Sequence, residues 1–457
     1  ETQVHAFACQ VVDMLAQRLP TRHVLPCVQR FCASAHGSPE PSGRRAAACV
    51  IGVAVEGCAE VLRPRAGEVV VPLVAALGDA EEEVVGAAAF SLGQVAEHLQ
   101  PDSSGHHAAV LPPLFAALGR ARRRGVQERL LYALDSWLEH LEDDAAPYVP
   151  SILRVTDTAL RSGVPGIQEL ALSAAASAAA SAGAAFRPFL PDLLPRLAAC
   201  LSECRDEFIS VRTRALECLG MLLCTEGGVE ALGPDTVRGA MGAALAGFQL
   251  DNTELREYAH GFFANAAQAL KGDFAPYLET VVPKALESVG LDDGTVLDAT
   301  DSDEESDSEG GGGGGGGHRS LSVRTGVLDE KASAVRALGA YADHCEGAFA
   351  PWLERALPAL QQMTGYFHED VREQAMAAVQ HCVVRCVLAV CPDPTHEGVR
   401  NACRLAFEAY AGAMEDDDDK EVVAAAANAA AETLAAVGRA AGGPPPGGGG
   451  GGSARRL

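Results

Sequence analysis

Nine acidic residues lie within eighteen positions of this chain, with no Lys or Arg among them: Asp292, Asp293, Asp298, Asp301, Asp303, Glu304, Glu305, Asp307 and Glu309. A run of like charge attracts basic ligands and competes for their positive groups. The centre of the run is therefore our candidate binding site for basic proteins: Asp301, Asp303, Glu304, Glu305, Asp307 and Glu309. The alternative is a solvated spacer with no specific partner.

No other set of residues has the spacing of a catalytic or metal site. The glycine run Gly310 to Gly317 lacks the Lys-Ser/Thr ending of a phosphate-binding loop. His381, Cys382, Cys386 and Cys391 form the best metal candidate, because positions i and i+4 share one face of a helix. Paired Cys-x-x-Cys motifs are missing, and cysteine is commonly a buried apolar residue, so we favour a core role. We expect no catalytic, cofactor-binding or metal-ligating residues, and no enzyme activity.

Composition narrows the class of partner. The 457 residues carry 36 Lys plus Arg and 61 Asp plus Glu, a formal charge of −25. Binding to nucleic acid or to anionic membranes depends on cationic side chains, so neither is expected as a partner. The fourteen cysteines show no disulfide framework and indicate a reducing compartment. The weakly polar stretch Leu170 to Phe186 is mostly Ala and Ser, so we expect no transmembrane segment.

Helical periodicity extends along almost the whole chain, and a recurring phrase divides it into repeats. The phrase places an aromatic residue before Pro, as in Phe186-Arg187-Pro188, Phe274-Ala275-Pro276 and Phe349-Ala350-Pro351, with a shortened copy at Pro147. We expect this Pro at the first position of a helix, with the aromatic residue packed back as a staple. Spacings near 41 to 44 residues, with two helices in each period, are typical of HEAT repeats.

The predicted fold is all-α, a HEAT-repeat α-α superhelix (a right-handed solenoid) of about ten helical hairpins, spanning residues 1–440. The second helix of each hairpin begins with an aliphatic residue followed by small residues that allow close helix packing. These second helices are predicted at 43–61, 81–99, 123–141, 165–183, 206–224, 251–270, 328–345, 368–390 and 418–438. An acidic and Gly-rich disordered insertion is expected at 291–319, and a disordered Gly/Pro-rich tail at 441–457. A second acidic run, Glu415 to Asp419, is interpreted as a solvated turn.

Several phrases resemble the importin-beta (karyopherin-beta) family of nuclear transport receptors, and its importin-4-like branch in particular. The acidic insertion is followed by Ser322-Val323-Arg324-Thr325, then by Gly347-Ala348-Phe349-Ala350-Pro351-Trp352 and His368-Glu369-Asp370-Val371-Arg372. The stretch from Phe90 to Pro101 is similar to another repeat of that branch. The order of these phrases, together with the position of the insertion, carries the resemblance.

The resemblance implies a receptor that carries basic cargo proteins, including histones and ribosomal proteins, through nuclear pores. It implies nucleoporins as partners, shuttling between cytoplasm and nucleus, and cargo release by the Ran GTPase in the full-length protein. We interpret the chain as a central fragment of such a receptor, without the amino-terminal repeats that form the main Ran site in the family. The alternative function is a HEAT-repeat structural scaffold that organises a multiprotein complex.

Overall fold

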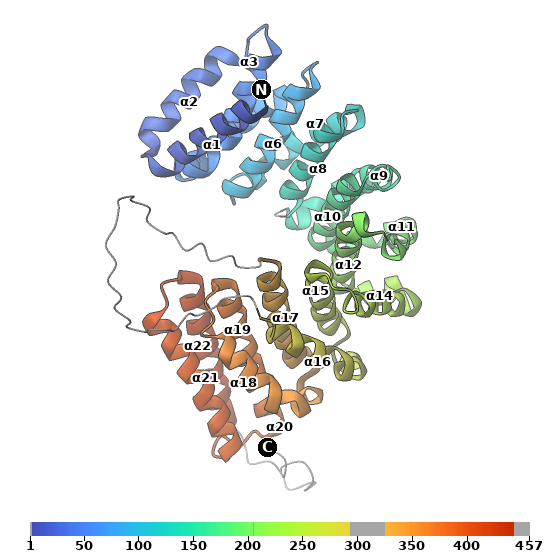
Figure 1. Ribbon diagram of the computed structural model, residues 1–457, viewed down its shortest axis with the longest axis vertical. Helices are drawn as coiled ribbons and strands as arrows, with labels where there is room; N and C mark the ends of the chain where they lie inside the picture. Colours follow the sequence, from blue (N-terminus) through green and yellow to red (C-terminus); the bar gives the residue numbers. More distant parts are fainter. Residues whose placement is uncertain (1, 140, 204, 293–324, 443–457) are drawn as a thin grey trace, which may run out of the picture. The chain divides into compact units, whose positions relative to one another are not determined.

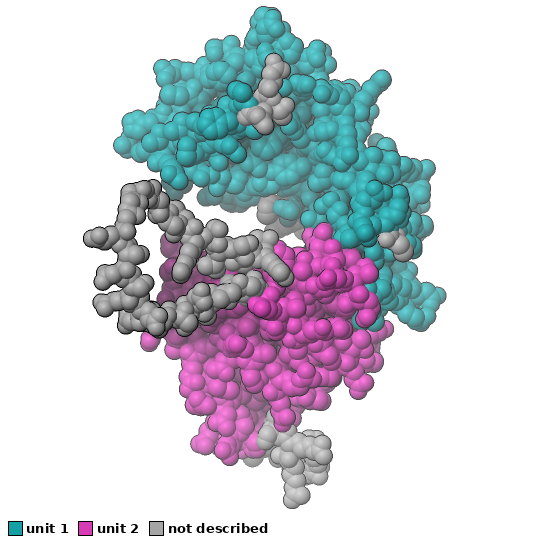
Figure 2. Space-filling view, in the orientation of Figure 1, with its two compact units in different colours: residues 1–247 teal, residues 248–457 magenta. Residues whose placement is uncertain are grey.

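The computed structural model describes residues 2–139, 141–203, 205–292 and 325–442. Every regular element in these ranges is a helix, and none of the residues in them forms a strand. The chain divides into two compact units, residues 1–247 and 248–457, which Figure 2 shows in different colours. The all-α fold is therefore confirmed. A single solenoid over residues 1–440 stays a prediction.

Unit 1 is built from antiparallel helix pairs that follow one another along the chain (Figure 1). Its first helices, on one side of each pair, are α2 (Thr21–Ala35), α5 (Gly67–Ala76), α7 (His107–Arg120), α9 (Val149–Leu160) and α11 (Leu190–Ser202). Its second helices are α3 (Pro41–Val55), α6 (Glu82–His98), α8 (Arg124–Leu138), α10 (Pro165–Ala182) and α12 (Ile209–Cys224). Helix α1 (Thr2–Arg18) precedes the pairs and contacts α3, and the short helix α4 (Ala59–Leu62) lies between α3 and α5. Helices α13 (Gly228–Leu232) and α14 (Pro234–Gly247) end the unit.

Unit 2 repeats this arrangement. The first helices are α16 (Leu278–Val289), α18 (Leu353–Met363) and α21 (Glu397–Asp416). The second helices are α15 (Thr253–Leu270), α17 (Thr325–Cys345), α19 (Glu369–His381) and α22 (Lys420–Gly442). Residues 382–387, after α19, form a π-helical turn that leads into α20 (Leu388–Val390).

Second helices pack on one another in chain order within each unit, so they form one layer and the first helices form the other (Figure 1). Small residues permit this packing. A Cβ atom at Gly339 of α17 would lie only 2.9 Å from the Cβ of Ala378 in α19. Helix α10 is packed between α8 and α12, and Ala171, Ala174 and Ala175 are fully buried.

One stretch, residues 165–202, is long and apolar enough to cross a membrane by length and composition. In the fold it is not one straight helix, because a 3₁₀ turn at residues 183–189 separates α10 from α11. The alanines of α10 are in the protein core, which accounts for its apolar composition.

The Pro-containing phrase is a turn rather than a helix start, which corrects the prediction. Pro188 and Pro276 lie inside 3₁₀ turns, and the α-helix begins two residues later, at Leu190 and Leu278. The aromatic residue two positions before each Pro is buried: Phe186 and Phe274 are at most 1% exposed. Phe274 also stacks on Tyr341 of α17, with ring centroids 5.5 Å apart. The aromatic residue therefore packs into the core as expected, and the tighter 3₁₀ turn accommodates the Pro.

A basic side chain near the start of several second helices joins its own interhelical turn to the next repeat. Arg372 donates to the Tyr366 carbonyl at 3.0 Å and to both carboxylate oxygens of Asp417 at 2.7 and 2.9 Å. Arg44 does the same with the Ser38 carbonyl (2.9 Å) and Asp79 (2.7 and 3.0 Å). These contacts fix the register between consecutive repeats, because a bidentate Arg–carboxylate pair is directional.

A Lys side chain makes a comparable contact between α17 and the residues that follow α16. The Lys331 ammonium donates to the Leu291 carbonyl at 2.8 Å and lies 4.8 Å from the centre of the Tyr366 ring. Beside it, the fully buried Glu330 accepts from Arg256 (2.9 Å) and from Ser288 (2.6 Å). We call the contact between Lys331 and Leu291 the Lys331 clasp.

Candidate functional site

The acidic run predicted to bind basic proteins is not part of the described structure. Its residues, Asp301, Asp303, Glu304, Glu305, Asp307 and Glu309, lie outside the residues that the structure describes. Its role stays a prediction, and the site must be sought among the described helices.

A second group of carboxylates lies on the second helices of unit 1. We call it the acidic ladder, and it consists of Glu97 at the end of α6, Asp135 in α8, Glu139 just after α8, and Glu217 in α12. Glu97 and Glu139 are exposed, whereas Asp135 and Glu217 are half-buried. Each side chain comes from a helix whose opposite face is in the core, so the stacking of the helices positions the ladder.

Polar side chains hold the first carboxylate of the ladder in position. The Tyr132 hydroxyl donates to Glu97 Oε1 at 2.7 Å, and Gln94 donates to Glu97 Oε2 at 3.0 Å. Tyr132 comes from the neighbouring helix, and it lies against Gly93, where any side chain would collide with the aromatic ring. Glu97 therefore has a defined orientation while it remains accessible to a ligand.

The central carboxylates interact with one another, as their pKa values show. Burial raises the pKa of Asp135, and the negative charge of Glu217 adds to the rise, although hydrogen bonds from Ser173 and Ser177 oppose it. Ser177 donates to Asp135 Oδ1 at 2.7 Å. Partial desolvation also raises the pKa of Glu139, together with the charges of Asp135, Glu97 and Glu217. Carboxylates that repel one another in this way are stabilised by an added cation.

One internal cation partly compensates the ladder. Arg214 forms an ion pair with Glu217 at 2.9 Å, one turn apart in α12. Four carboxylates and one guanidinium leave the surface strongly negative. The arrangement can bind Lys or Arg side chains.

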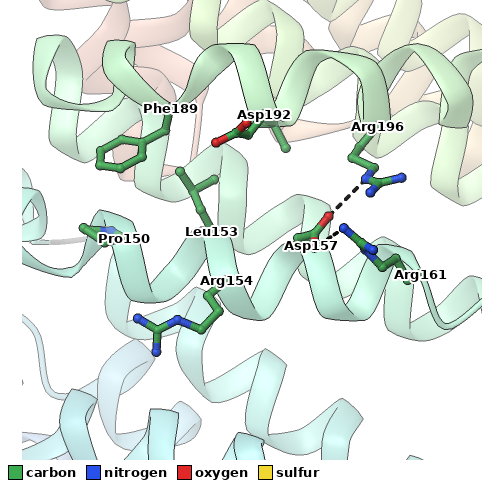
Figure 3. Close-up of a pocket in the computed structure, with 9 residues that line it drawn as sticks. Pro150, Leu153, Arg154, Asp157, Arg161, Phe189, Asp192 and Arg196 are labelled. Atoms are coloured by element: carbon green, nitrogen blue, oxygen red, sulfur yellow. Dashed lines mark hydrogen bonds and ion pairs between the residues drawn. The ribbon is translucent and has the colours of Figure 1, made fainter.

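A pocket of about 370 Å³ lies between the first helices α9 and α11 (Figure 3). Asp157, at its centre, pairs with Arg161 at 2.9 Å and with Arg196 at 3.0 Å. Hydrogen bonds from Arg161, and then from Arg196, hold the pKa of Asp157 below its usual value. Figure 3 shows Asp192 in the same pocket and apart from this pair. Because the Asp157 carboxylate is held in its ionised form, it is a poor general acid. Its ion pair with Arg196 joins α9 to α11.

The cysteine set predicted to be a core feature lies in the interior. Cys382 and Cys386 are fully buried, and the Cys386 thiol donates to the Ala342 and Glu346 carbonyls at 3.3 Å each. Within the described part of the chain, its sulfur atoms do not belong to a group of three ligand atoms that could hold a metal ion.

The acidic run from Glu415 to Asp419 covers the end of α21 and the turn before α22, and two of its residues have structural partners. Asp417 binds Arg372, and Asp419 accepts hydrogen bonds from the Glu421 and Val422 backbone N–H groups at 2.9 and 3.0 Å. Asp419 thus satisfies the free N–H groups at the start of α22. The exposed Glu415, Asp416 and Asp418 agree with the interpretation as a solvated turn.

Comparison with known proteins agrees with the repeat architecture. Residues 42–95, which contain α3 and α6, match the family model described as a HEAT-like repeat. The chain is 27% identical to "Probable importin subunit beta-4" of Schizosaccharomyces pombe, over 82% of this chain and 36% of that protein. It is 28% identical to Importin-4 of Homo sapiens, over 91% of this chain and 40% of that protein. The predicted resemblance to the importin-beta family is confirmed.

Solved structures show the same fold for this importin-like chain. The structure titled "Crystal structure of Kap121p bound to Pho4p" superposes with a TM-score of 0.74 at 21% identity, covering 94% of this chain and 41% of that one. A second, of Kap121p bound to Nup53p, has a TM-score of 0.72. The importin-like chain spans about two fifths of the length of these relatives.

Sequence reasoning missed the acidic ladder. In the sequence of the importin-like chain its members look like ordinary surface acids, one or two to a helix. The available signal was the repeat itself, because Glu97 and Glu139 are 42 residues apart, one repeat length, and therefore occupy similar places on neighbouring second helices.

Proposed function

We propose that this chain is part of a nuclear import receptor that binds basic cargo proteins, such as histones and ribosomal proteins, through the acidic ladder. The mechanism is binding rather than catalysis. One observation carries the proposal: carboxylates from α6, α8 and α12 lie close enough for their charges to raise one another's pKa values, in a protein of the importin-beta type. Cargo Lys and Arg side chains would relieve the repulsion among these carboxylates.

Charge-neutralising substitutions test the ladder. The variant Glu97→Gln, Asp135→Asn, Glu139→Gln, Glu217→Gln removes its charge and keeps side-chain size. The control, Glu60→Gln, Asp192→Asn, Glu226→Gln, Glu230→Gln, changes the net charge equally at exposed positions of unit 1 outside the ladder. Affinity for a histone-tail peptide, measured by fluorescence anisotropy, should fall by more than about tenfold in the first variant, since each lost charge contact contributes on the order of 1 kcal/mol. Equal losses in the two variants would mean that only net charge matters.

The acidic run between α16 and α17 is proposed as a second contact for basic cargo. Replacing Asp301, Asp303, Glu304, Glu305, Asp307 and Glu309 with Ser should weaken histone binding and flatten its dependence on salt. Unchanged affinity and unchanged salt dependence would refute this role and leave the ladder proposal standing.

We propose that the full-length protein releases cargo when Ran-GTP binds, and that it shuttles between cytoplasm and nucleus. A pull-down of the full-length protein on immobilised cargo, with and without Ran-GTP, tests the release. Cargo that stays bound in both conditions would favour a permanent scaffold instead.

Nucleoporin binding is proposed at an apolar pocket of about 290 Å³ between α7 and α9. Leu118, Leu131 and Val155 line it, and an aromatic side chain of a pore protein would fit this surface. The double variant Leu118→Glu, Val155→Glu should abolish capture on a phenylalanine-rich nucleoporin segment. Val71→Glu, at a Val that is 67% exposed on α5, is the control and should bind normally.

A further inference from the structure

Two thiols and an imidazole converge where α1 crosses α3. His5 and Cys9 are one turn apart on the same face of α1, and Cys49 comes from α3, forty residues further along the chain. The Cys9 sulfur lies 3.6 Å from His5 Nδ1 and 3.9 Å from the Cys49 sulfur. The three ligand atoms all lie within 4.8 Å of one another, and no other such group occurs in the described part of the chain.

The two separations from the Cys9 sulfur match the edges of a metal-centred tetrahedron. With Zn–S bonds of about 2.3 Å and a Zn–N bond of about 2.0–2.1 Å, tetrahedral angles put two sulfur atoms about 3.8 Å apart and sulfur and nitrogen about 3.6 Å apart. A disulfide would need the two sulfur atoms at about 2.05 Å. The distances of 3.9 and 3.6 Å therefore leave room for an ion between the side chains.

The charges and the accessibility of the site also suit zinc. Two thiolates and a neutral imidazole exactly balance the charge of a divalent ion, and sulfur ligands favour zinc over magnesium or calcium. Burial and the neighbouring Cys9 raise the pKa of the Cys49 thiol to about 12, and the charges of Arg129 and Arg45 oppose this rise. His5 is exposed and both cysteines are partly exposed, so an ion can enter from solvent.

We propose that His5, Cys9 and Cys49 form a Cys₂His zinc site whose fourth position is open to water or to a further ligand. This site joins α1 to the first helix pair of unit 1. It differs from the sequence-based expectation of no metal site, which considered only cysteines close together along the chain. The proposal is independent of cargo binding.

A matched pair of cysteines makes the experiment specific. His23 and Cys27 on α2 repeat the His-x-x-x-Cys spacing of His5 and Cys9. Cys27 is exposed and, among the described residues, belongs to no group of three possible metal ligands. Zinc affinity is measured on the full chain in a phosphine reductant, by competition with a chromophoric chelator, for the wild type and for Cys9→Ser, Cys49→Ser, His5→Gln and Cys27→Ser. Cobalt titration supplies a spectroscopic readout, and circular dichroism checks that each variant is folded.

One zinc ion per wild-type chain is expected, with a sulfur-to-cobalt charge-transfer band and tetrahedral d–d bands. Cys9→Ser and Cys49→Ser should each lower zinc affinity by more than about tenfold, the smallest loss typical of disturbing even an outer-shell partner. His5→Gln should do the same, while Cys27→Ser should behave as wild type. Zinc should raise the unfolding temperature of the wild type and not of Cys49→Ser.

Three results would overturn the site. The first is the absence of stoichiometric zinc in the wild type. The second is an equal loss of zinc in Cys27→Ser, which would indicate non-specific thiol binding. The third is a wild-type chain that forms a disulfide between Cys9 and Cys49 when the reductant is removed and shows no cobalt spectrum when it is present.

Discussion

At the scale of single residues, the pair of Arg372 and Asp417 shows how consecutive repeats are held in register. Only 13% of the Arg372 side chain and 8% of the Asp417 side chain are exposed. The Arg372 guanidinium, through its hydrogen bonds, lowers the pKa of Asp417 below its usual value. Removing either partner leaves a largely desolvated charge without its counterion.

Arg372→Ala should therefore lower the free energy of unfolding by about 2–3 kcal/mol, the loss typical of charge-assisted hydrogen bonds in a largely buried pair. Arg404→Ala is the control, because Arg404 and Glu408 form an exposed pair within α21 that should contribute at most about 0.5 kcal/mol. Urea denaturation measures both values. A similar effect of the two substitutions would contradict the role of Arg372.

The contribution of this pair should also depend on pH. Because the pKa of Asp417 is lowered in the folded state, its stabilisation is complete above the unfolded pKa near 4 and is lost as the pH falls through the folded pKa. The difference in stability between wild type and Arg372→Ala should be constant from pH 7 to about 5 and shrink below about pH 4. Denaturation curves at several pH values measure this difference in stability. A difference that stays constant below about pH 4 would contradict the prediction.

At the scale of helices, close approach depends on a few glycines. A Cβ atom at Gly52 of α3 would collide with the Ser91 side chain and lie 2.7 Å from the Ser91 Cα in α6. Gly242, inside α14, has no atom within 4 Å of the corresponding position. The same substitution should therefore have opposite effects at the two positions.

Gly52→Ala should destabilise unit 1 by about 1–3 kcal/mol, the usual cost of overpacking. Gly242→Ala should stabilise it by about 0.5–1 kcal/mol, because Ala loses less backbone entropy than Gly in a helix. Thermal unfolding followed by circular dichroism compares the two. If Gly52→Ala were neutral, α3 and α6 would be able to separate without loss of packing.

Periodicity predicted the second helices well and failed where distant segments intervene. The helix predicted at 251–270 is observed as α15, residues 253–270. The helix predicted at 43–61 is observed as α3, a 3₁₀ turn at 56–58 and α4. The turn lies where α1 comes so close that a Cβ at Gly57 would lie 2.7 Å from the Gln17 nitrogen. The π-helical turn after α19 was also missed, because nothing in its residues distinguishes it from an α-helix.

At the scale of the whole molecule, acidic residues are distributed along the whole sequence. Only the folded structure brings four of them together in the acidic ladder. The formal charge of −25 predicted basic partners without indicating where they bind. Asp135 and Glu217 lie 82 residues apart and act on each other only because α8, α10 and α12 are stacked in order. A contact of this kind depends on tertiary structure, so the sequence alone could not show it.

Cargo binding at the ladder should weaken in mildly acidic solution. The pKa values of Asp135 and Glu139 are raised, so these carboxyls take up protons at a higher pH than ordinary carboxyls near 4 and lose their attraction for cations. Affinity for a Lys- and Arg-rich peptide without His should fall as the pH decreases from 7 to about 5. The variant Asp135→Asn, Glu139→Gln should bind the peptide more weakly at pH 7, and its affinity should change less with pH. If the affinity of the variant fell with pH as steeply as that of the wild type, these two carboxyls would be excluded as the cause.

The Lys331 clasp makes the packing of α16 on α17 independent of the length of the segment that connects them. Leu291 follows the end of α16 and Lys331 lies in the second turn of α17, and these two residues are joined directly. Doubling the length of a flexible connection costs only about 0.6 kcal/mol in closure entropy. A change in the length of the segment between α16 and α17 should therefore cost little free energy while these two helices keep the same packing.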